Sequence, residues 1–140
     1  MDARVILYDY AMRFVGLPYR WGGDDSVDGF DCSGLVLELL KSADCYPAGS
    51  DTTASGLYDL FAGLSAAEPR FGSLAFFGST KVTHVGFCLN TTQMLEAGGG
   101  GSKTLTEADA AAQNAFIRVR PIKSRKDLVG FRHPPYPWKG

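Results

Sequence analysis

The sequence predicts an α+β fold in which N-terminal helices pack on an antiparallel sheet. Apolar residues recur at helical spacing in the first half of the chain, whereas short runs of branched and aromatic residues follow Pro69. Helical and strand patterns do not alternate, as the units of a parallel sheet would require. The chain has 140 residues, 45% of them hydrophobic, which is enough for a hydrophobic core. We therefore expect a single domain spanning residues 1–140.

Three amphipathic segments are predicted as helices, over residues 3–15, 32–43 and 52–64. Asp2 is the expected N-cap of the first helix, and Gly16 and Pro18 end it. Ser50 or Asp51 is expected to cap the third helix. The loop between the first two helices, residues 17–30, is rich in Gly and Asp.

Four strands are predicted after Pro69, over residues 73–77, 82–89, 93–97 and 115–120. Residues 108–112 are expected to add a short helical turn. The four-glycine run at residues 98–101 has two interpretations: a flexible loop, or a place where a backbone or ligand approaches closely. Residues 123–140 are interpreted as a proline-rich tail.

Composition and charge exclude several classes of function. The net charge is −1, and Lys and Arg are scattered along the chain, so no nucleic-acid partner is expected. No run of 18 apolar residues is present, and no membrane span is predicted. Three cysteines and two histidines, without a CxxC pair, predict neither a disulfide framework nor a zinc site. No metal or cofactor is expected.

Cys32 is the candidate nucleophile. It stands where a loop becomes a helix, so the positive end of the helix dipole favours the reactive thiolate. Its neighbours Asp31 and Ser33 are polar, whereas a buried structural thiol, the alternative, usually has apolar surroundings. Cys45 in a loop and Cys88 within a strand lack this setting and are interpreted as packing residues.

His84, 52 residues after Cys32, is the candidate base, and Glu96 is the candidate third member of a catalytic triad. In a hairpin of residues 82–89 and 93–97, a loop centred on Asn90 places His84 directly opposite Glu96. A loop centred on Thr91 makes them diagonal neighbours on one face. A two-residue turn would send Glu96 to the other face.

These motifs together resemble those of the NlpC-type cell-wall peptidases, which are cysteine peptidases of papain-like fold. The resemblance extends over about residues 4–122. It rests on PYRWGG at 18–23, FDCSGLV at 30–36, LAFFG at 74–78 and THVGF at 83–87. It implies a papain-like domain with the catalytic positions on Cys32, His84 and Glu96. The third position usually holds His, Asn or Gln, so a glutamate there is a departure.

The resemblance also implies hydrolysis of amide bonds in the peptide stems of peptidoglycan, usually the bond between a D-γ-glutamyl residue and a diamino acid. Tyr19 falls on the family tyrosine that helps to bind the oxyanion. Asp31, Ser33 and Trp21 are the expected substrate-binding residues. Peptidoglycan stem peptides are therefore the expected partner.

Two other functions stay open. One is an amidase or acyltransferase of the same superfamily that acts on another amide or on a lipid. The other is a catalytically inactive module that binds the wall or belongs to a phage tail. Because the N-terminal residues carry no secretory signal pattern, one hypothesis is a phage-encoded enzyme. It would be carried on the virion among phage tail proteins or released at lysis. The alternatives are a cytoplasmic recycling enzyme and a truncated secreted one.

Overall fold

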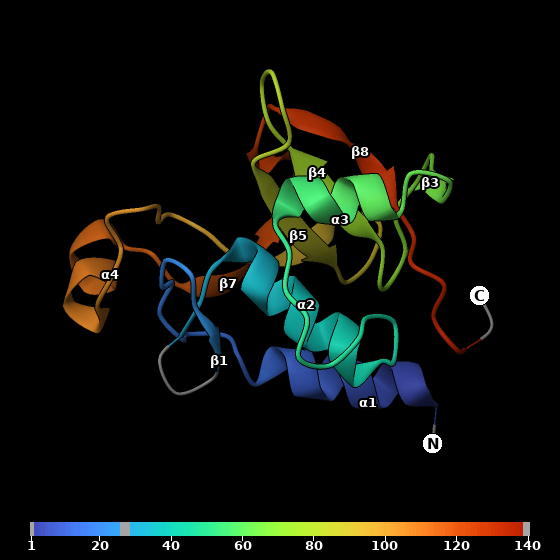
Figure 1. Cartoon of the computed structure of the whole chain (residues 1–140), viewed down its shortest axis with the longest axis horizontal. Helices are drawn as coiled ribbons and strands as arrows, with labels where there is room; N and C mark the ends of the chain where they lie inside the picture. Colours follow the sequence, from blue (N-terminus) through green and yellow to red (C-terminus); the bar gives the residue numbers. More distant parts are fainter. Residues whose placement is uncertain (1, 26–28, 139–140) are drawn as a thin grey trace.

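The computed structural model describes residues 2–25 and 29–138, and it confirms the predicted α+β class (Figure 1). Its helices are α1 (Ala3–Met12), α2 (Cys32–Ser42), α3 (Ala54–Leu60), α4 (Glu107–Gln113) and the 3₁₀ helix η1 (Ile122–Ser124). Its strands are β1 (Asp24–Asp25), β2 (Gly29–Phe30), β3 (Ser65–Ala66), β4 (Leu74–Phe77), β5 (His84–Cys88), β6 (Gln93–Ala97), β7 (Ile117–Pro121) and β8 (Leu128–Arg132). β1 and β2 form a small hairpin, and the other strands form one antiparallel sheet in the order β3-β8-β4-β5-β6-β7.

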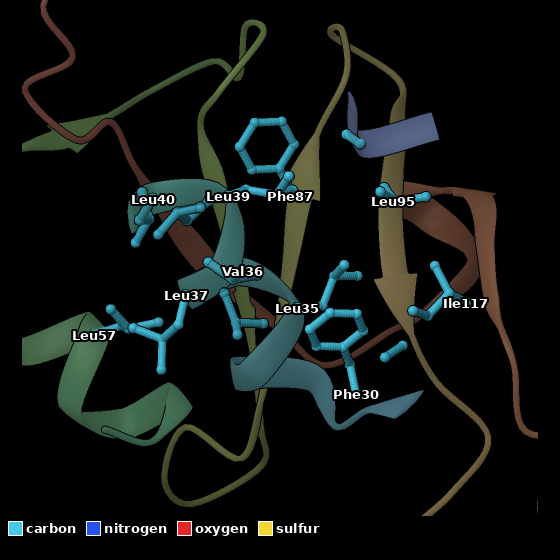
Figure 2. Packing of buried hydrophobic residues seen from close by; sticks show 14 of the residues in the cluster. Phe30, Leu35, Val36, Leu37, Leu39, Leu40, Leu57, Phe87, Leu95 and Ile117 are labelled. Atoms are coloured by element: carbon cyan, nitrogen blue, oxygen red, sulfur yellow. The ribbon is translucent and has the colours of Figure 1, made fainter. Parts of the chain in front are cut away.

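The main hydrophobic core lies between α2 and one face of the sheet. Leu35 and Leu39 of α2 are fully buried, as are Phe87 of β5 and Leu95 of β6. Figure 2 shows these side chains between the helix and the strands, and it shows Leu37 of α2 directed toward α3. Burying a large apolar side chain contributes about 1.5–3 kcal/mol. This core therefore fixes α2, and with it the residue at its N-terminus, against the sheet.

A smaller cluster covers the opposite face of the sheet. It consists of Ala75, Phe77, Cys88, Met94 and Ile122, with Phe131 packed against it. Side chains alternate between the two faces of a strand, so His84 of β5 shares this face with Cys88. The start of β5 therefore brings a polar side chain to the edge of a small apolar cluster.

The predicted helices are present, but each is shorter than expected. α1 ends at Met12 and α2 at Ser42, within one to three residues of the predicted ends. α3 covers only Ala54–Leu60, and its N-cap is Thr53, whose side chain accepts a hydrogen bond from the Gly56 N–H at 3.0 Å. The prediction of Ser50 or Asp51 as this cap was wrong. None of the described helices has both the length and the hydropathy that a membrane-spanning segment needs.

The predicted strands are also present, whereas two segments were misinterpreted. The predicted loop at 17–30 contains the hairpin of β1 and β2, although residues 26–28 lie outside the described part of the chain. The predicted tail at 123–140 contains β8, which pairs with both β3 and β4 inside the main sheet. The predicted helical turn at 108–112 is the two-turn helix α4, whose N-terminus carries a capping box.

Candidate active site

Cys32 is the first residue of α2, and the residues around it hold the start of that helix in place. The Asp31 side chain is the N-cap: its Oδ1 accepts from the Gly34 N–H at 2.7 Å, and its Oδ2 accepts from the Gly22 N–H at 3.1 Å. A Cβ on Gly34 would lie 2.1 Å from the carbonyl oxygen of Gly23, so only glycine fits there. The motif thus presents Cys32 at the positive end of the helix dipole.

His84 and Glu96 form a buried ion pair at one end of the sheet. Phe87 pairs with Leu95 across β5 and β6, a register centred on Thr91 that makes His84 and Glu96 diagonal neighbours on one face. His84 Nε2 donates to Glu96 Oε1 at 3.0 Å. The two residues are only 7% and 1% exposed, so water weakens this pair little.

The ion pair raises the pKa of His84 and lowers that of Glu96. Burial alone would lower the pKa of His84, but hydrogen bonds with the Cys32 side chain and with Glu96 outweigh it and raise the pKa to about 9. Burial would raise the pKa of Glu96, but the hydrogen bond from His84 and the charges of His84, Arg120 and Arg125 lower it overall. At neutral pH the imidazole is therefore protonated and the carboxylate ionised.

These shifts define the pH range in which the pair stabilises the fold. The pKa of His84 is raised, so its contribution is complete below the ordinary value of 6.5 and is lost as the pH rises through about 9. The pKa of Glu96 is lowered, so its contribution is complete above the ordinary value of 4.5 and is lost at more acid pH. The pair is therefore fully stabilising between about pH 4.5 and 6.5.

Tyr19 lies beside Cys32 with a hydroxyl group that stays protonated. Burial raises the pKa of Tyr19 well above its ordinary value, and the nearby Cys32 and Asp31 raise it further. The backbone N–H of Tyr19 donates to the carbonyl of Ala115 at 2.9 Å, which fixes its position. Tyr19 can therefore act as a hydrogen-bond donor toward negative charge that develops near the sulfur.

Two adjoining cavities meet at Cys32, Tyr19 and Trp21. The first has a volume of about 300 Å³ and is lined further by Asp31, Ser33 and the segment before α3. The second, of about 230 Å³, is lined further by His84, the glycine run and Arg125. We call them the α2 cavity and the β5 cavity. The sulfur of a nucleophile at their junction would face a substrate that extends into both.

The other three residues predicted to bind substrate all line the α2 cavity. Trp21 is 52% exposed, and its ring is available to a ligand. Ser33 is buried, and its hydroxyl donates to Asp31 Oδ1 at 3.4 Å. Both oxygens of Asp31 accept hydrogen bonds from the protein, so its capping role is a structural finding while its contact with substrate stays a prediction.

The glycine run belongs to the site, which favours close approach over a merely flexible loop. A Cβ on Gly100 would lie 2.4 Å from Cδ1 of Tyr19, and one on Gly98 would lie 2.9 Å from Glu96 Oε1. A larger residue at position 98 or 100 would displace the side chain of Glu96 or of Tyr19, respectively. The run therefore forms the wall of the β5 cavity because it lacks side chains.

Several residues that line the site were not predicted from the sequence, and three of them are polar or charged residues close to Cys32 or His84 in the cavities. Thr83 lines both cavities, Asp51 lines the α2 cavity, and Arg125 lines the β5 cavity. Thr83 directly precedes the candidate base, and this adjacency was an available signal. The other two come from segments interpreted as a helix cap and a tail, and no local pattern placed them near Cys32.

The remaining two cysteines differ from Cys32 in setting, and both are free thiols. Cys88 is fully buried in the smaller cluster, and burial raises its pKa to about 12. Burial, together with the nearby Asp44, raises the pKa of Cys45. Neither is therefore activated as a nucleophile, in agreement with their interpretation as packing residues.

Substituting Glu96 by glutamine is expected to move the alkaline limb of the pH–activity profile toward lower pH. The side-chain oxygen can still accept from His84 Nε2, but the negative charge that raises the pKa of His84 is gone. A limb near pH 9 should therefore shift by about one to two units. The measurement is kcat/KM of hydrolysis from pH 5 to 10.

The matched control is Glu107→Gln, which removes a carboxylate from the exposed first turn of α4. Glu96 Oε2 is buried and has no hydrogen-bond partner in the described part of the chain, so the new amide nitrogen would lack an acceptor. Thermal melting therefore accompanies the kinetics. An unchanged alkaline limb in a folded Glu96→Gln protein would contradict the assignment of Glu96.

Comparison with known proteins gives a consistent family match. A family model described as "NlpC/P60 family" matches residues 16–120. The bifunctional muramidase/DL-endopeptidase CwlT of Bacillus subtilis is 33% identical over 72% of this chain. The murein DD-endopeptidase MepH of Escherichia coli is 34% identical over 84% of it. The aligned regions cover only 31% and 45% of those two proteins, so the chain spans less than half the length of each.

Solved structures confirm the predicted NlpC-type fold. An NLP/P60 family protein of Staphylococcus aureus, described as similar to lipoprotein, has a TM-score of 0.71 and 28% identity, covering 96% of this chain and 42% of that one. RipD of Mycobacterium tuberculosis, described as a non-catalytic NlpC/p60 domain protein adapted to peptidoglycan binding, has a TM-score of 0.71 and 18% identity, covering 96% of this chain and 98% of that one. The fold of this chain is therefore also the fold of a protein described as non-catalytic.

Proposed function

Because the chain belongs to the NlpC/P60 family, we propose that it is a cysteine endopeptidase that hydrolyses amide bonds in the peptide stems of peptidoglycan. The observation that carries this proposal is the arrangement of three side chains. Cys32 begins a helix and lines the β5 cavity together with His84, whose pKa it helps to raise and which is ion-paired with Glu96. A nucleophile, a base and a group that orients the base are the parts that covalent acyl transfer requires.

In the proposed reaction His84 holds the proton of Cys32, and the two form a thiolate–imidazolium pair before substrate is attacked. Nε2 of His84 is bound to Glu96, so Nδ1 is the nitrogen that holds this proton. The sulfur then attacks the scissile carbonyl carbon and forms a tetrahedral intermediate. The Cys32 backbone N–H, at the start of a helix, and the Tyr19 hydroxyl donate to its oxyanion, and removing one such donor typically costs about 3 kcal/mol.

Collapse of the intermediate breaks the C–N bond and leaves a thioester on Cys32. His84 gives its proton to the departing nitrogen, which leaves as an amine. A water molecule, deprotonated by His84, attacks the thioester and releases the second product as a carboxylate. The raised pKa of His84 suits the donor role, since the imidazole is protonated at neutral pH.

The bond that we propose joins a D-γ-glutamyl residue to a diamino acid. The names of the two relatives differ on this point: one is a DL-endopeptidase and the other a DD-endopeptidase. A D-glutamyl bond to an L-configured diamino acid is of the DL kind. Cleavage of a DL bond and cleavage of a DD bond release different fragments, so the masses of the fragments show which bond is cut.

The test is digestion of purified cell wall followed by mass analysis of the soluble fragments. We expect new primary amines and fragments that begin with the diamino acid. Fragments cut between two D-configured centres would support endopeptidase activity but contradict the proposed bond. A wall that releases no fragment, with protein that melts cooperatively, would contradict the enzyme proposal.

Turnover-free wall binding is the competing function, because a relative in structure is described as non-catalytic. The presence of Cys32 and His84 in one cavity, with His84 bound to Glu96, argues against it here. Action on another amide or on a lipid would appear as hydrolysis of those compounds by a protein that leaves stem peptides intact. Virion association and release at lysis stay predictions, tested by probing purified particles and lysates for the protein.

A further inference from the structure

Arg125 is held in place beside the candidate catalytic residues, although the mechanism above gives it no role. Its guanidinium lies over the ring of Phe77 at 5.1 Å from the centroid. Its Nε and Nη2 donate to the two carboxylate oxygens of Asp127 at 3.1 and 3.0 Å. Nη1 makes no hydrogen bond within the described part of the chain. Arg125 therefore presents an oriented donor at the β5 cavity, which it lines together with Cys32 and His84.

The two cavities differ in the charge of their walls. Among the described residues, the α2 cavity is lined by the carboxylates of Asp31 and Asp51 and by no lysine or arginine. The β5 cavity is lined by Arg125 and by no aspartate or glutamate. A substrate that crosses Cys32 thus meets negative charge on one side and positive charge on the other.

The chemistry of amide hydrolysis decides which part of the substrate enters which cavity. His84 must reach the departing nitrogen to give it a proton, so the leaving group has to lie on the His84 side of the scissile bond. His84 lines the β5 cavity and does not line the α2 cavity. The leaving residue therefore occupies the β5 cavity, and the acyl part of the substrate occupies the α2 cavity.

We propose that Arg125 determines specificity by binding a carboxylate on the leaving residue. This inference rests on the proposed function. Guanidinium groups bind carboxylates in planar, charge-assisted pairs, and here Asp127 and Phe77 fix the plane in advance, which reduces the entropy lost on binding. In a stem peptide that ends at the diamino acid, the α-carboxyl group of this leaving residue is free and lies one carbon from the departing nitrogen. Arg125 selects the free acid over its amide.

The experiment is a competition between two synthetic peptides in one tube. L-Ala-γ-D-Glu-L-Lys with a free C-terminal carboxylate competes with the same peptide ending in a carboxamide, and mass spectrometry follows both. The ratio of their consumption rates gives the ratio of the two kcat/KM values directly. The unsubstituted 140-residue chain is compared with Arg125→Gln, Arg125→Lys and the control Lys126→Gln, which removes an exposed charge from the neighbouring position.

Wild-type protein and Lys126→Gln are expected to prefer the carboxylate by about 10- to 100-fold, the size of one charge-assisted hydrogen-bond pair. Arg125→Gln should lose this preference, because cleavage of the carboxylate slows more than cleavage of the carboxamide. Arg125→Lys should retain part of it. Continued cleavage of the carboxamide by Arg125→Gln also demonstrates that the variant is folded.

Three results would count against the proposal, and they are distinguishable. If Arg125→Gln slows both peptides equally, Arg125 acts on the acyl part or on the fold. If wild-type protein cleaves both peptides at one rate, no carboxylate is selected. Each of these first two results overturns the role of Arg125 but leaves the proposed endopeptidase activity standing. If wild-type protein cleaves neither peptide and no wall fragment appears, the proposed function itself fails.

Discussion

Cys32→Ala is expected to abolish hydrolysis, with a loss on the order of 10⁴-fold or more in kcat, because removing the nucleophile from a triad removes covalent catalysis entirely. The protein should still fold. Cys32 is only partly buried at the start of α2, and the cap from Asp31 to Gly34 does not involve the sulfur. The measurement is the release of primary amines from purified cell wall, with thermal melting of the same samples.

The matched control is Cys45→Ala, a free thiol that is also partly buried but lies outside both cavities. It should digest the wall at the wild-type rate. Cys32→Ser tests the chemistry more finely, since a hydroxyl of similar size is far less acidic than a thiol. It should be nearly as inactive as the alanine variant. Wall digestion by Cys32→Ala at the wild-type rate would contradict the mechanism.

Proton NMR gives a second measurement of the same contact. The side-chain hydrogen bond and charge of Cys32 help to raise the pKa of His84, so the imidazole should titrate at lower pH in Cys32→Ala. The chain has only two histidines. Burial and the nearby Arg70 lower the pKa of His133 to about 4, so the titration of His133 is complete well below the pH range in which His84 titrates. An unchanged titration of His84 would mean that the thiol and imidazole do not interact.

Local chemistry explains why the position of Cys32 at a helix start and of His84 beside Glu96 could be predicted from the sequence. The N-cap, the first helical residue and the required glycine all lie within residues 31–34, so the helix start that presents Cys32 is encoded within four residues. The hairpin of β5 and β6 spans 14 residues, and its parity limited His84 and Glu96 to a few registers. Both features depend on contacts between residues close in the chain.

The rest of the site depends on contacts between residues far apart in the chain. Arg125 reaches the β5 cavity because Leu128–Arg132 returns to pair with β4, whose residues lie more than 50 positions earlier. Asp51 lines the α2 cavity because Thr53 takes over the capping role, so α3 begins two residues later than the earliest predicted start. Neither effect leaves a local pattern. Nearby prolines after Arg132 favoured the interpretation of the segment as a tail.

Deleting residues 123–140 is expected to unfold the domain, which a dispensable tail would not do. β8 lies between β3 and β4 in the sheet, so its loss exposes the hydrogen-bonding edge of β4. It also removes Phe131 from the smaller cluster. Natural domains are stable by only about 5–15 kcal/mol, and losing an interior strand exceeds that margin. Circular dichroism and thermal melting measure the outcome.

The residues that follow β8 make further specific contacts that hold the C-terminal segment on the domain. Tyr136 is buried, and its hydroxyl donates to the Gly72 carbonyl at 2.6 Å. Its ring stacks on Trp138 with centroids 4.3 Å apart. His133 Nδ1 is hydrogen-bonded to Ser73 Oγ at 2.9 Å. Tyr136→Phe should therefore destabilise the protein by about 1–3 kcal/mol, because the buried carbonyl loses its donor.

Point variants separate the loss of the strand from the effects of shortening the chain. Truncating a fully packed phenylalanine to alanine costs about 3–5 kcal/mol. Phe131 is only partly buried, so Phe131→Ala should destabilise the protein by less than this. Val129→Thr changes an exposed residue of the same strand and keeps a β-branched side chain, so it should stay within about 0.5 kcal/mol of wild type. A protein lacking residues 123–140 that melts with wild-type cooperativity and temperature would contradict the structural role assigned to β8.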